Sequence, residues 1–366
     1  MIENALKGNR SYWIWTILLL LLIASGISAY FEQLRLGISV TGLGAALPWG
    51  LATMQFTFMA SAAAATLLVV LPFTLHDYKP FGNIVIIAQF MGASASAIAL
   101  LSLFLDMGKP QLILDLLRYA TPYSPYSWAF FLLIGYFLIN LVTGWATLGA
   151  ERKDVPAPAW TKPLIYLSIP WAIILPVVTG LIYASFPANH WIASLLALRL
   201  LASAYAGGTA LLLLIIFLMK RAAGDDAGRE VTDKLVMLLT YAASITFVLV
   251  GVECFASLWG RGSLLQYKNL TVSLTWLSLV LGIASLTVFY MPAWKNSIRH
   301  LIAGSLGVVL SIFAEKGAAL LSLSNGGIVA YTPTMKELSM VLGVLALGTL
   351  LLTILLKAVL AVKRAG

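Results

Sequence analysis

The sequence predicts an all-α integral membrane protein with ten transmembrane helices. Of its 366 residues, 61% are apolar and only 10% are charged, whereas soluble domains are about half apolar and about a quarter charged. The mean hydropathy is +0.95, and apolar runs of about 20 residues, the length that crosses a bilayer as a helix, recur ten times. These observations exclude a soluble enzyme, a nucleic-acid-binding module and a disordered scaffold.

The apolar runs are expected to be helices because a helix satisfies its own backbone polar groups, as lipid requires. The connections are short, so we predict a single transmembrane domain over residues 1–366. The first run follows Lys7 and Arg10 but lacks a cleavage site of small residues, which predicts a retained span rather than a signal peptide. The expected spans are 12–35, 48–73, 83–105, 127–149, 163–185, 192–219, 233–258, 272–292, 298–316 and 336–361.

Individual spans contain features that predict their packing and their ends. Runs of Ala, Ser and Gly at 60–65, 93–97 and 202–208 predict close helix contacts in the second, third and sixth spans. In the fifth span, Pro170 and Pro176 offer a break in the helix, because proline cannot continue the hydrogen-bond ladder.

Basic residues give the orientation. The loops and tails on one side of the predicted bundle contain fourteen Lys and Arg residues, and those on the other side contain seven. This excess predicts a multi-pass protein of the cytoplasmic (inner) membrane with both termini in the cytoplasm. It also accounts for most of the formal charge of +9, so no nucleic-acid partner is indicated and the expected surroundings are the lipid bilayer.

Ionisable residues near or within the spans gather on the predicted outer side. Asp106 closes the third span there, and Arg199 and Glu253 lie about two turns inside the sixth and seventh spans. Because these two spans are consecutive and antiparallel, an Arg199–Glu253 ion pair is expected if they pack. Charges inside a membrane are costly and often functional, but a pair that only neutralises itself is an equally good interpretation.

Three glutamates are expected at the outer interface, where their side chains reach water. Glu32 closes the first span, Glu315 closes the ninth, and Glu337 opens the tenth. Asp106 is the strongest single candidate for a functional residue, because a loop held by Gly108 and proline follows it directly.

The chain is expected to hold no redox centre of its own. A single cysteine, Cys254, cannot ligate an iron–sulfur cluster, which needs about four thiolates. His76, His190 and His300 are predicted at helix ends, too far apart to ligate haem in pairs. No metal site is predicted either.

The segment 106–128 contains the most specific motif. It reads Asp106-Met-Gly-Lys-Pro110, then a loop, then Ser124-Pro125-Tyr-Ser-Trp128. Gly108 and Pro110 end the third helix, Pro125 disfavours helix at Ser124, and Ser127 is a candidate cap for the fourth helix. The pattern therefore predicts a fixed outer loop with a carboxylate at its root.

This segment resembles the Asp-x-Gly-Arg-Pro … Ser-Pro-x-Ser-Trp signature of the NrfD/polysulfide-reductase (PsrC-like) membrane-subunit family, with Lys109 in place of the usual arginine. The ten-span HybB, HmcC and DsrP-like branch is the most similar. Further matches cover nearly the whole chain: Pro48-Trp49-Gly50, Leu201 to Gly208, and Tyr331-Thr-Pro333 followed by Glu337.

The resemblance implies two four-helix bundles, helices 2–5 and 6–9, flanked by helices 1 and 10. It also implies a quinone, with menaquinone expected, held near the outer face without haem, iron–sulfur cluster or metal in this chain. The implied partners are an iron–sulfur, ferredoxin-like subunit docked on the outer loops, and other membrane and cytochrome subunits, with sulfur metabolism as the expected context.

The leading hypothesis is therefore a quinone-reactive subunit of a respiratory redox complex. Asp106 would accept a proton or a hydrogen bond, with Lys109, Ser127 and Trp128 shaping the site. A second set of residues would support the site or form a proton path: Glu253, Arg199, Glu32 and Glu315. Two alternatives stay open, a secondary transporter built from two bundles and a passive membrane anchor without a quinone site.

Overall fold

The computed structural model describes most of the chain as helix. The described residues are 8–43, 49–76, 78–109, 115, 118–119, 123–184, 190–224, 227–259, 270–295, 297–323 and 331–363. Within these ranges ten helical segments are long and apolar enough to cross a membrane, and no strand occurs among them. The prediction of an all-α, ten-span membrane protein is confirmed.

The helices follow one another along the chain in alternating directions. The first two spans are α2 (Arg10–Leu36) and the pair α3 (Leu51–Ala64) and α4 (Leu67–Leu75). The remaining long helices are α5 (Gly82–Asp106), α7 (Pro125–Arg152), α8 (Thr161–Ala184), α9 (His190–Ala223), α10 (Arg229–Trp259), α11 (Leu270–Tyr290), α13 (Ile298–Leu323) and α14 (Met335–Lys363). Short turns lie between them: η1 (Ile38–Val40), η2 (Lys79–Phe81) and α12 (Pro292–Lys295).

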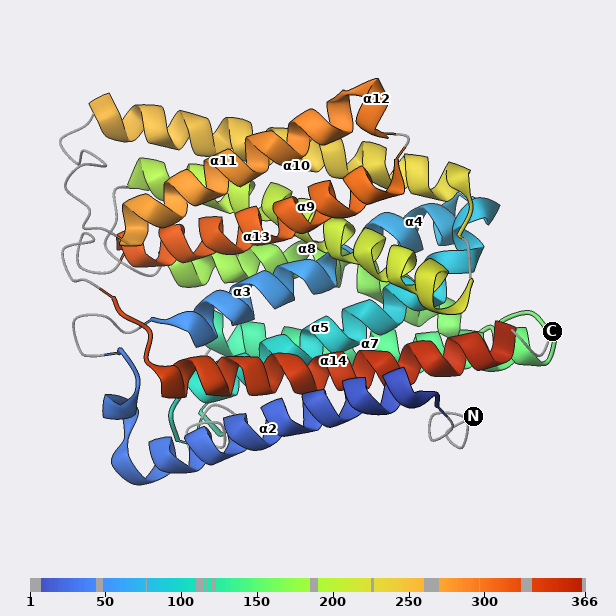
Figure 1. Cartoon of the computed structure of the whole chain (residues 1–366), viewed down its shortest axis with the longest axis horizontal. Helices are drawn as coiled ribbons and strands as arrows, with labels where there is room; N and C mark the ends of the chain where they lie inside the picture. The colour runs from blue at the N-terminus through green and yellow to red at the C-terminus, as the bar shows by residue number, and fades with distance from the viewer. Residues whose placement is uncertain are drawn as a thin grey trace.

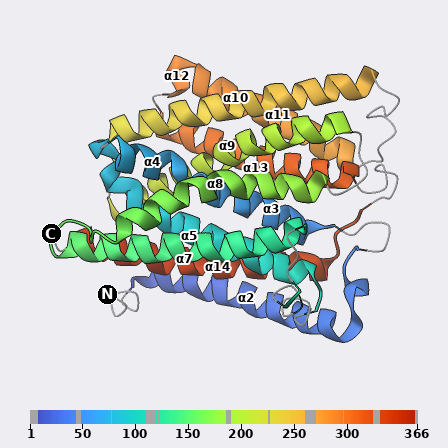
Figure 2. The same cartoon turned by 180° about the vertical axis from the view of Figure 1, so that it is seen from behind.

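The long helices form two groups and a flanking pair. α3, α4, α5, α7 and α8 pack together as one group, and α9, α10, α11 and α13 as the other, with α3 against α9 and α13 at the junction. α2 and α14 lie side by side along one edge, where α14 packs on α5 (Figure 1 and Figure 2). The two bundles flanked by the first and last helices are those expected.

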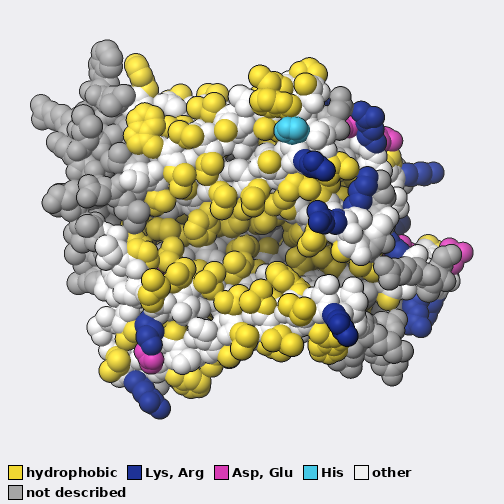
Figure 3. All heavy atoms as spheres, in the orientation of Figure 1, with side chains coloured by type: hydrophobic (Ala, Val, Ile, Leu, Met, Phe, Trp, Pro, Cys, Tyr) yellow, Lys and Arg dark blue, Asp and Glu magenta, His cyan; other side chains and the backbone are white. Residues whose placement is uncertain are grey.

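The surface fits a membrane-crossing bundle. Figure 3 shows apolar side chains across the middle of one face, and most of the Lys and Arg side chains at the end where the two termini lie. Large apolar side chains such as Leu21, Val248 and Trp276 are more than three-fifths exposed. We call the opposite end of the bundle, where α5 finishes, the Asp106 end.

Small residues bring helix backbones together, as the sequence predicted. A Cβ atom on Gly26 of α2 would lie 2.8 Å from the Gly343 Cα of α14, and one on Gly208 of α9 would lie 2.7 Å from the Ala62 carbonyl oxygen of α3. Neither position admits a side chain without moving a helix, so these contacts fix the flanking pair and the junction of the two groups.

Two details of the spans differ from expectation. The predicted break at Pro170 and Pro176 is wrong, because α8 runs through both prolines. The second span instead has a short turn at Ala65–Thr66, between α3 and α4, where the backbone hydrogen bonds run to the third preceding residue. Both residues keep right-handed helical backbone angles, so Leu51–Leu75 remains one span. There the Thr66 hydroxyl pairs with the Tyr136 hydroxyl at 2.6 Å.

Candidate functional site

Asp106 is the last residue of α5. The helix ends because Gly108 takes a left-handed φ of +71°, a conformation that glycine adopts at helix ends at little cost. Thr53, in the first turn of α3, donates its hydroxyl to Asp106 Oδ1 at 2.7 Å. No other described residue donates to this carboxyl group, so Oδ2 is available to a further partner.

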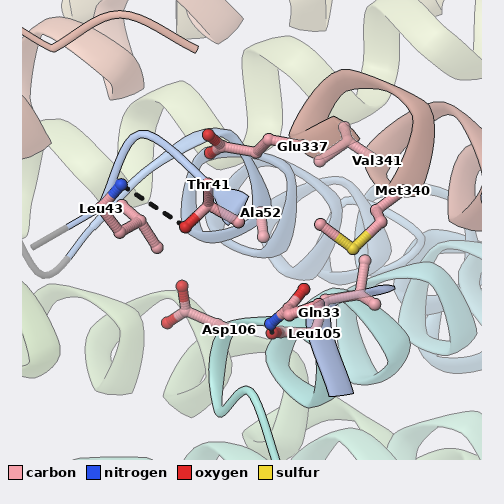
Figure 4. A pocket seen from close by; sticks show the side chains of 9 residues that line it. All are labelled: Gln33, Thr41, Leu43, Ala52, Leu105, Asp106, Glu337, Met340 and Val341. Atoms are coloured by element: carbon pink, nitrogen blue, oxygen red, sulfur yellow. Dashed lines mark hydrogen bonds between the residues drawn. The ribbon is translucent and has the colours of Figure 1, made fainter. Parts of the chain in front are cut away.

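Asp106 lines a small pocket at this end of the bundle (Figure 4). Its walls come from α2, the segment that follows η1, α3, α5 and α14. The space inside holds about one water molecule, so a ring-sized ligand requires side chains to move. The lining residues are Gln33, Thr41, Leu43, Ala52, Leu105, Asp106, Glu337, Met340 and Val341.

Glu337 is the second carboxylate of the pocket, and it is buried, so its predicted interfacial position is wrong. Its oxygens accept from the Leu51 backbone N–H at 2.8 Å and the Gly42 backbone N–H at 3.3 Å. The Tyr331 hydroxyl donates to the same carboxylate. The negative charge therefore sits at the start of α3, where the unpaired N–H groups of a helix favour an anion.

The surroundings of Glu337 explain two further sequence features. Burial, and then the hydrogen bond to the Glu337 carboxylate, raises the pKa of Tyr331 above its usual value, so its hydroxyl keeps the proton that it donates. A Cβ atom on Gly50 would collide with the Glu337 carboxylate and the Tyr331 hydroxyl. The position before α3 therefore requires glycine.

Gln33 is the third polar side chain of the pocket. It is only 3% exposed, and its Nε2 donates to the Leu105 carbonyl oxygen at 3.2 Å. Its Oε1 is buried and accepts no hydrogen bond from a described residue. Buried polar atoms are rarely left without a partner, so a water molecule or a ligand group is the expected partner of this oxygen.

The other residues expected around Asp106 lie away from this pocket. Lys109 is exposed and forms no ion pair with Asp106, and Trp128 is half exposed on α7. Ser127 is buried in the first turn of α7, but Ser124 caps that helix, since its hydroxyl oxygen accepts from the Ser127 N–H at 3.4 Å. The prediction that Ser127 is the cap is wrong.

A separate cluster of charges lies within the second group of helices. Arg199 of α9 forms an ion pair with Glu253 of α10, as predicted. Its Nε also lies 2.7 Å from Glu315 Oε1, although the two are poorly aligned for a hydrogen bond. Arg199 and Glu315 are 5% and 3% exposed. The prediction that Glu315 closes its helix and reaches water is wrong, because α13 continues to Leu323.

Lys316 is also buried in this cluster, and it bonds to Ser203 of α9 at 3.2 Å. Tyr183 of α8 lies between the two sites: its hydroxyl donates to Thr57 Oγ1 at 3.1 Å and approaches the Lys316 carbonyl oxygen at 3.5 Å. Thr57 is one turn along α3 from Thr53, so α3 forms a wall shared by the pocket and the charge cluster.

Glu32 is exposed, and its position at the outer interface stays a prediction. It pairs with Lys336 at 2.6 Å, and both side chains are more than two-fifths exposed. Exposed pairs of this kind contribute little to stability. In the described part of the chain, no three His, Cys, Asp or Glu side chains are close enough to hold a metal ion.

Comparison with known proteins agrees with the motif. The family model described as polysulphide reductase, NrfD, matches residues 39–325. The chain belongs to the NrfD family. A protein from Archaeoglobus fulgidus named "Hdr-like menaquinol oxidoreductase integral membrane subunit" is 26% identical, over 94% of this chain and 92% of that protein. A putative dimethyl sulfoxide reductase membrane subunit from Halobacterium salinarum is 25% identical, over 92% of this chain and 88% of that protein.

Sequence reasoning missed Gln33 and misplaced Glu337, the two polar side chains that line the pocket with Asp106 (Figure 4). Gln33 is an uncharged residue near the end of the first span. Glu337 was predicted to reach water because it lies at the start of the last span. The available signal was that an amide and a carboxylate both occur in otherwise apolar helices, where polar side chains require partners.

Proposed function

We propose that this NrfD-family membrane protein is the quinone-reactive subunit of a redox complex, and that the pocket beside Asp106 receives the quinone head group. The observation that carries the proposal is the unpartnered Gln33 oxygen, buried in the same pocket as two carboxyl groups. Menaquinone is the proposed quinone. The name of the Archaeoglobus fulgidus relative supports this choice.

The residues of the pocket have distinct roles in this proposal. Thr53 holds Oδ1 of Asp106, which leaves Oδ2 to accept a proton from a quinol hydroxyl. Glu337 cannot turn toward the ligand without giving up two backbone N–H groups and the Tyr331 hydroxyl, so it acts as a fixed wall. Oxidation of one quinol releases two protons and two electrons, and the electrons pass to an iron–sulfur cluster in a partner subunit.

The apolar part of the pocket provides the entrance. Met340 and Val341 of α14, with Leu43, line it beside the polar groups. Methionine side chains are flexible and adapt to irregular ligands, so movement of Met340 is the simplest way to admit a ring. Because the flanking pair of α2 and α14 is exposed along much of its length, this entrance is reached from the lipid, where quinones dissolve.

The proposed orientation of the protein in the membrane follows from the excess of Lys and Arg residues on one side of the bundle. Both termini lie at one end of the bundle (Figure 1), and we propose that this end faces the cytoplasm. The Asp106 end then faces outward, and the iron–sulfur partner docks there. Other membrane and cytochrome subunits complete the proposed complex.

The test is quinol-linked electron transfer in membranes that contain the whole complex. We expect Asp106→Asn, which removes the proton acceptor but keeps the shape, to lower turnover at least about a hundredfold, a typical contribution of one general base. The matched control is Asp233→Asn, since Asp233 is an exposed carboxylate in an i,i+4 pair with Arg229. Full turnover by Asp106→Asn with normal assembly would contradict the assignment.

A transporter is the alternative, and the feature that bears on it is the irregular turn in the second span at Ala65–Thr66. Transporters built from repeats have broken helices at corresponding places in both halves. In the described residues of the second group, α9, α10, α11 and α13 run without such a break. Transport by purified protein in liposomes, without an iron–sulfur protein that co-purifies, would favour this alternative, and absence of extractable quinone would favour a passive anchor.

A further inference from the structure

Most donors of the side chains that line the pocket are already in hydrogen bonds, whereas two acceptors are free. The Thr41 hydroxyl donates to the Ile38 carbonyl oxygen at 2.6 Å, and the amide nitrogen of Gln33 donates to the Leu105 carbonyl oxygen. Among the lining side chains, only the second hydrogen on that nitrogen remains as a donor. Gln33 Oε1 and Asp106 Oδ2 are free to accept.

The orientation of the Gln33 amide follows from its neighbour. A backbone carbonyl oxygen only accepts hydrogen bonds, so the amide nitrogen must face Leu105 and the oxygen must face the other way. Figure 4 shows the nitrogen at Leu105 and the oxygen on the side of the pocket. A buried acceptor without a partner is unfavourable, so this position favours a water molecule or a ligand hydroxyl as the partner of the Gln33 oxygen.

Glu337 adds a second reason for a ligand that donates. Its carboxylate is held in place by two backbone N–H groups and the Tyr331 hydroxyl, so its negative charge stays at the wall of the pocket. A carbonyl oxygen, which is partly negative, is repelled by that wall, whereas a hydroxyl hydrogen is attracted.

We infer that this pocket selects the reduced, hydroxyl-bearing form of the quinone, with Gln33 Oε1 accepting from one of its hydroxyl groups. The inference rests on the proposed function and adds the redox form that binds. A hydroquinone has two hydroxyl donors, whereas the oxidised quinone has only carbonyl acceptors. The reduced form therefore satisfies Gln33 Oε1, and the oxidised form leaves that oxygen unpaired.

The test compares the affinity of the two redox forms. Menaquinone with a short side chain, and its dithionite-reduced hydroquinone, are titrated without oxygen into the purified complex in lipid nanodiscs. Gln33→Leu is the test variant. Gln89→Leu is the matched control: Gln89 is 2% exposed, donates once from Nε2, to Thr143 at 3.2 Å, and also leaves its Oε1 without a partner among the described residues, but it does not line the pocket.

We expect the wild-type protein to bind the hydroquinone about tenfold more tightly than the quinone, the scale of one hydrogen bond. Gln33→Leu should remove this preference by weakening hydroquinone binding alone, and Gln89→Leu should keep it. Equal affinity of the wild type for the two forms, or equal weakening of both by Gln33→Leu, would overturn the inference while leaving the proposed function standing. Binding of neither form by the wild type would overturn both.

Discussion

Replacing Glu337 tests whether its carboxylate joins the two ends of the chain, and the magnitude can be worked from its three donors. Leucine at this position would leave the Gly42 N–H and the Tyr331 hydroxyl without their acceptor, whereas the Leu51 N–H keeps the Tyr331 hydroxyl oxygen at 2.9 Å. Each unsatisfied buried donor costs about 1–3 kcal/mol. We therefore expect Glu337→Leu to destabilise the protein by roughly 2–6 kcal/mol.

Glu337→Gln keeps the size of the side chain but changes its hydrogen bonds, so it separates the effect of hydrogen bonding from that of shape. Its side-chain oxygen can still accept from Leu51 and Tyr331, but its NH₂ group would face the Gly42 N–H, so one bond is lost and two donors meet. The expected cost is about 1–3 kcal/mol. The order of stability should be wild type, then Glu337→Gln, then Glu337→Leu.

The assay is thermal unfolding of the purified protein in detergent at one fixed scan rate, because membrane proteins often unfold irreversibly and the apparent Tm then depends on the rate. Lys336→Gln is the control: it removes the exposed pair with Glu32 one residue away, and it should change stability by less than about 1 kcal/mol. An apparent Tm of Glu337→Leu equal to that of the wild type would refute the reasoning.

Three further predictions concern the charge cluster, the tyrosine and the pocket. Arg199→Leu leaves Glu253 and Glu315 without their cation, and should cost about 3–5 kcal/mol in the same unfolding assay. The pKa of Tyr331 is raised in the folded state, so the protonated hydroxyl stabilises the fold below its ordinary pKa of 10.0, and this stabilisation is lost as pH rises above that value. Tyr331→Phe should therefore make Tm fall less between neutral and strongly alkaline pH. Ala52→Phe fills the pocket and should abolish quinone binding in the titration above without preventing assembly.

The ten spans could be predicted because lipid imposes their length and composition locally. No knowledge of neighbouring helices is needed to recognise about 20 apolar residues. The Arg199–Glu253 pair was predictable for a related reason, since consecutive spans at similar depth are close neighbours in most bundles. Asp106 was identified from the turn that follows it, which is again local.

The remaining part of the site could not be read from local patterns. Glu337 accepts hydrogen bonds from Leu51 and Gly42, which lie nearly the whole length of the chain away in sequence, and these contacts depend on how α14 packs against α2, α3 and α5. Glu315 was misplaced because a charged pair of residues normally marks the end of a span, whereas here Arg199 neutralises it inside the bundle. The cap of α7 was misassigned because Pro125 at the first helical position makes Ser124, not Ser127, the preceding capping residue.

The pocket draws its walls from both the first and the last helix, and this has a consequence for biosynthesis. Residues emerge from the ribosome in order, so α2 with Gln33 is inserted into the membrane at the beginning of translation. The pocket is complete only after α14, which supplies Glu337, Met340 and Val341, has also been inserted. A nascent protein interrupted before residue 331 lacks both Tyr331 and Glu337, and the start of α3 is left without its anion. Under the proposed function, the protein therefore gains the ability to bind the quinone only after the final helix has been synthesised.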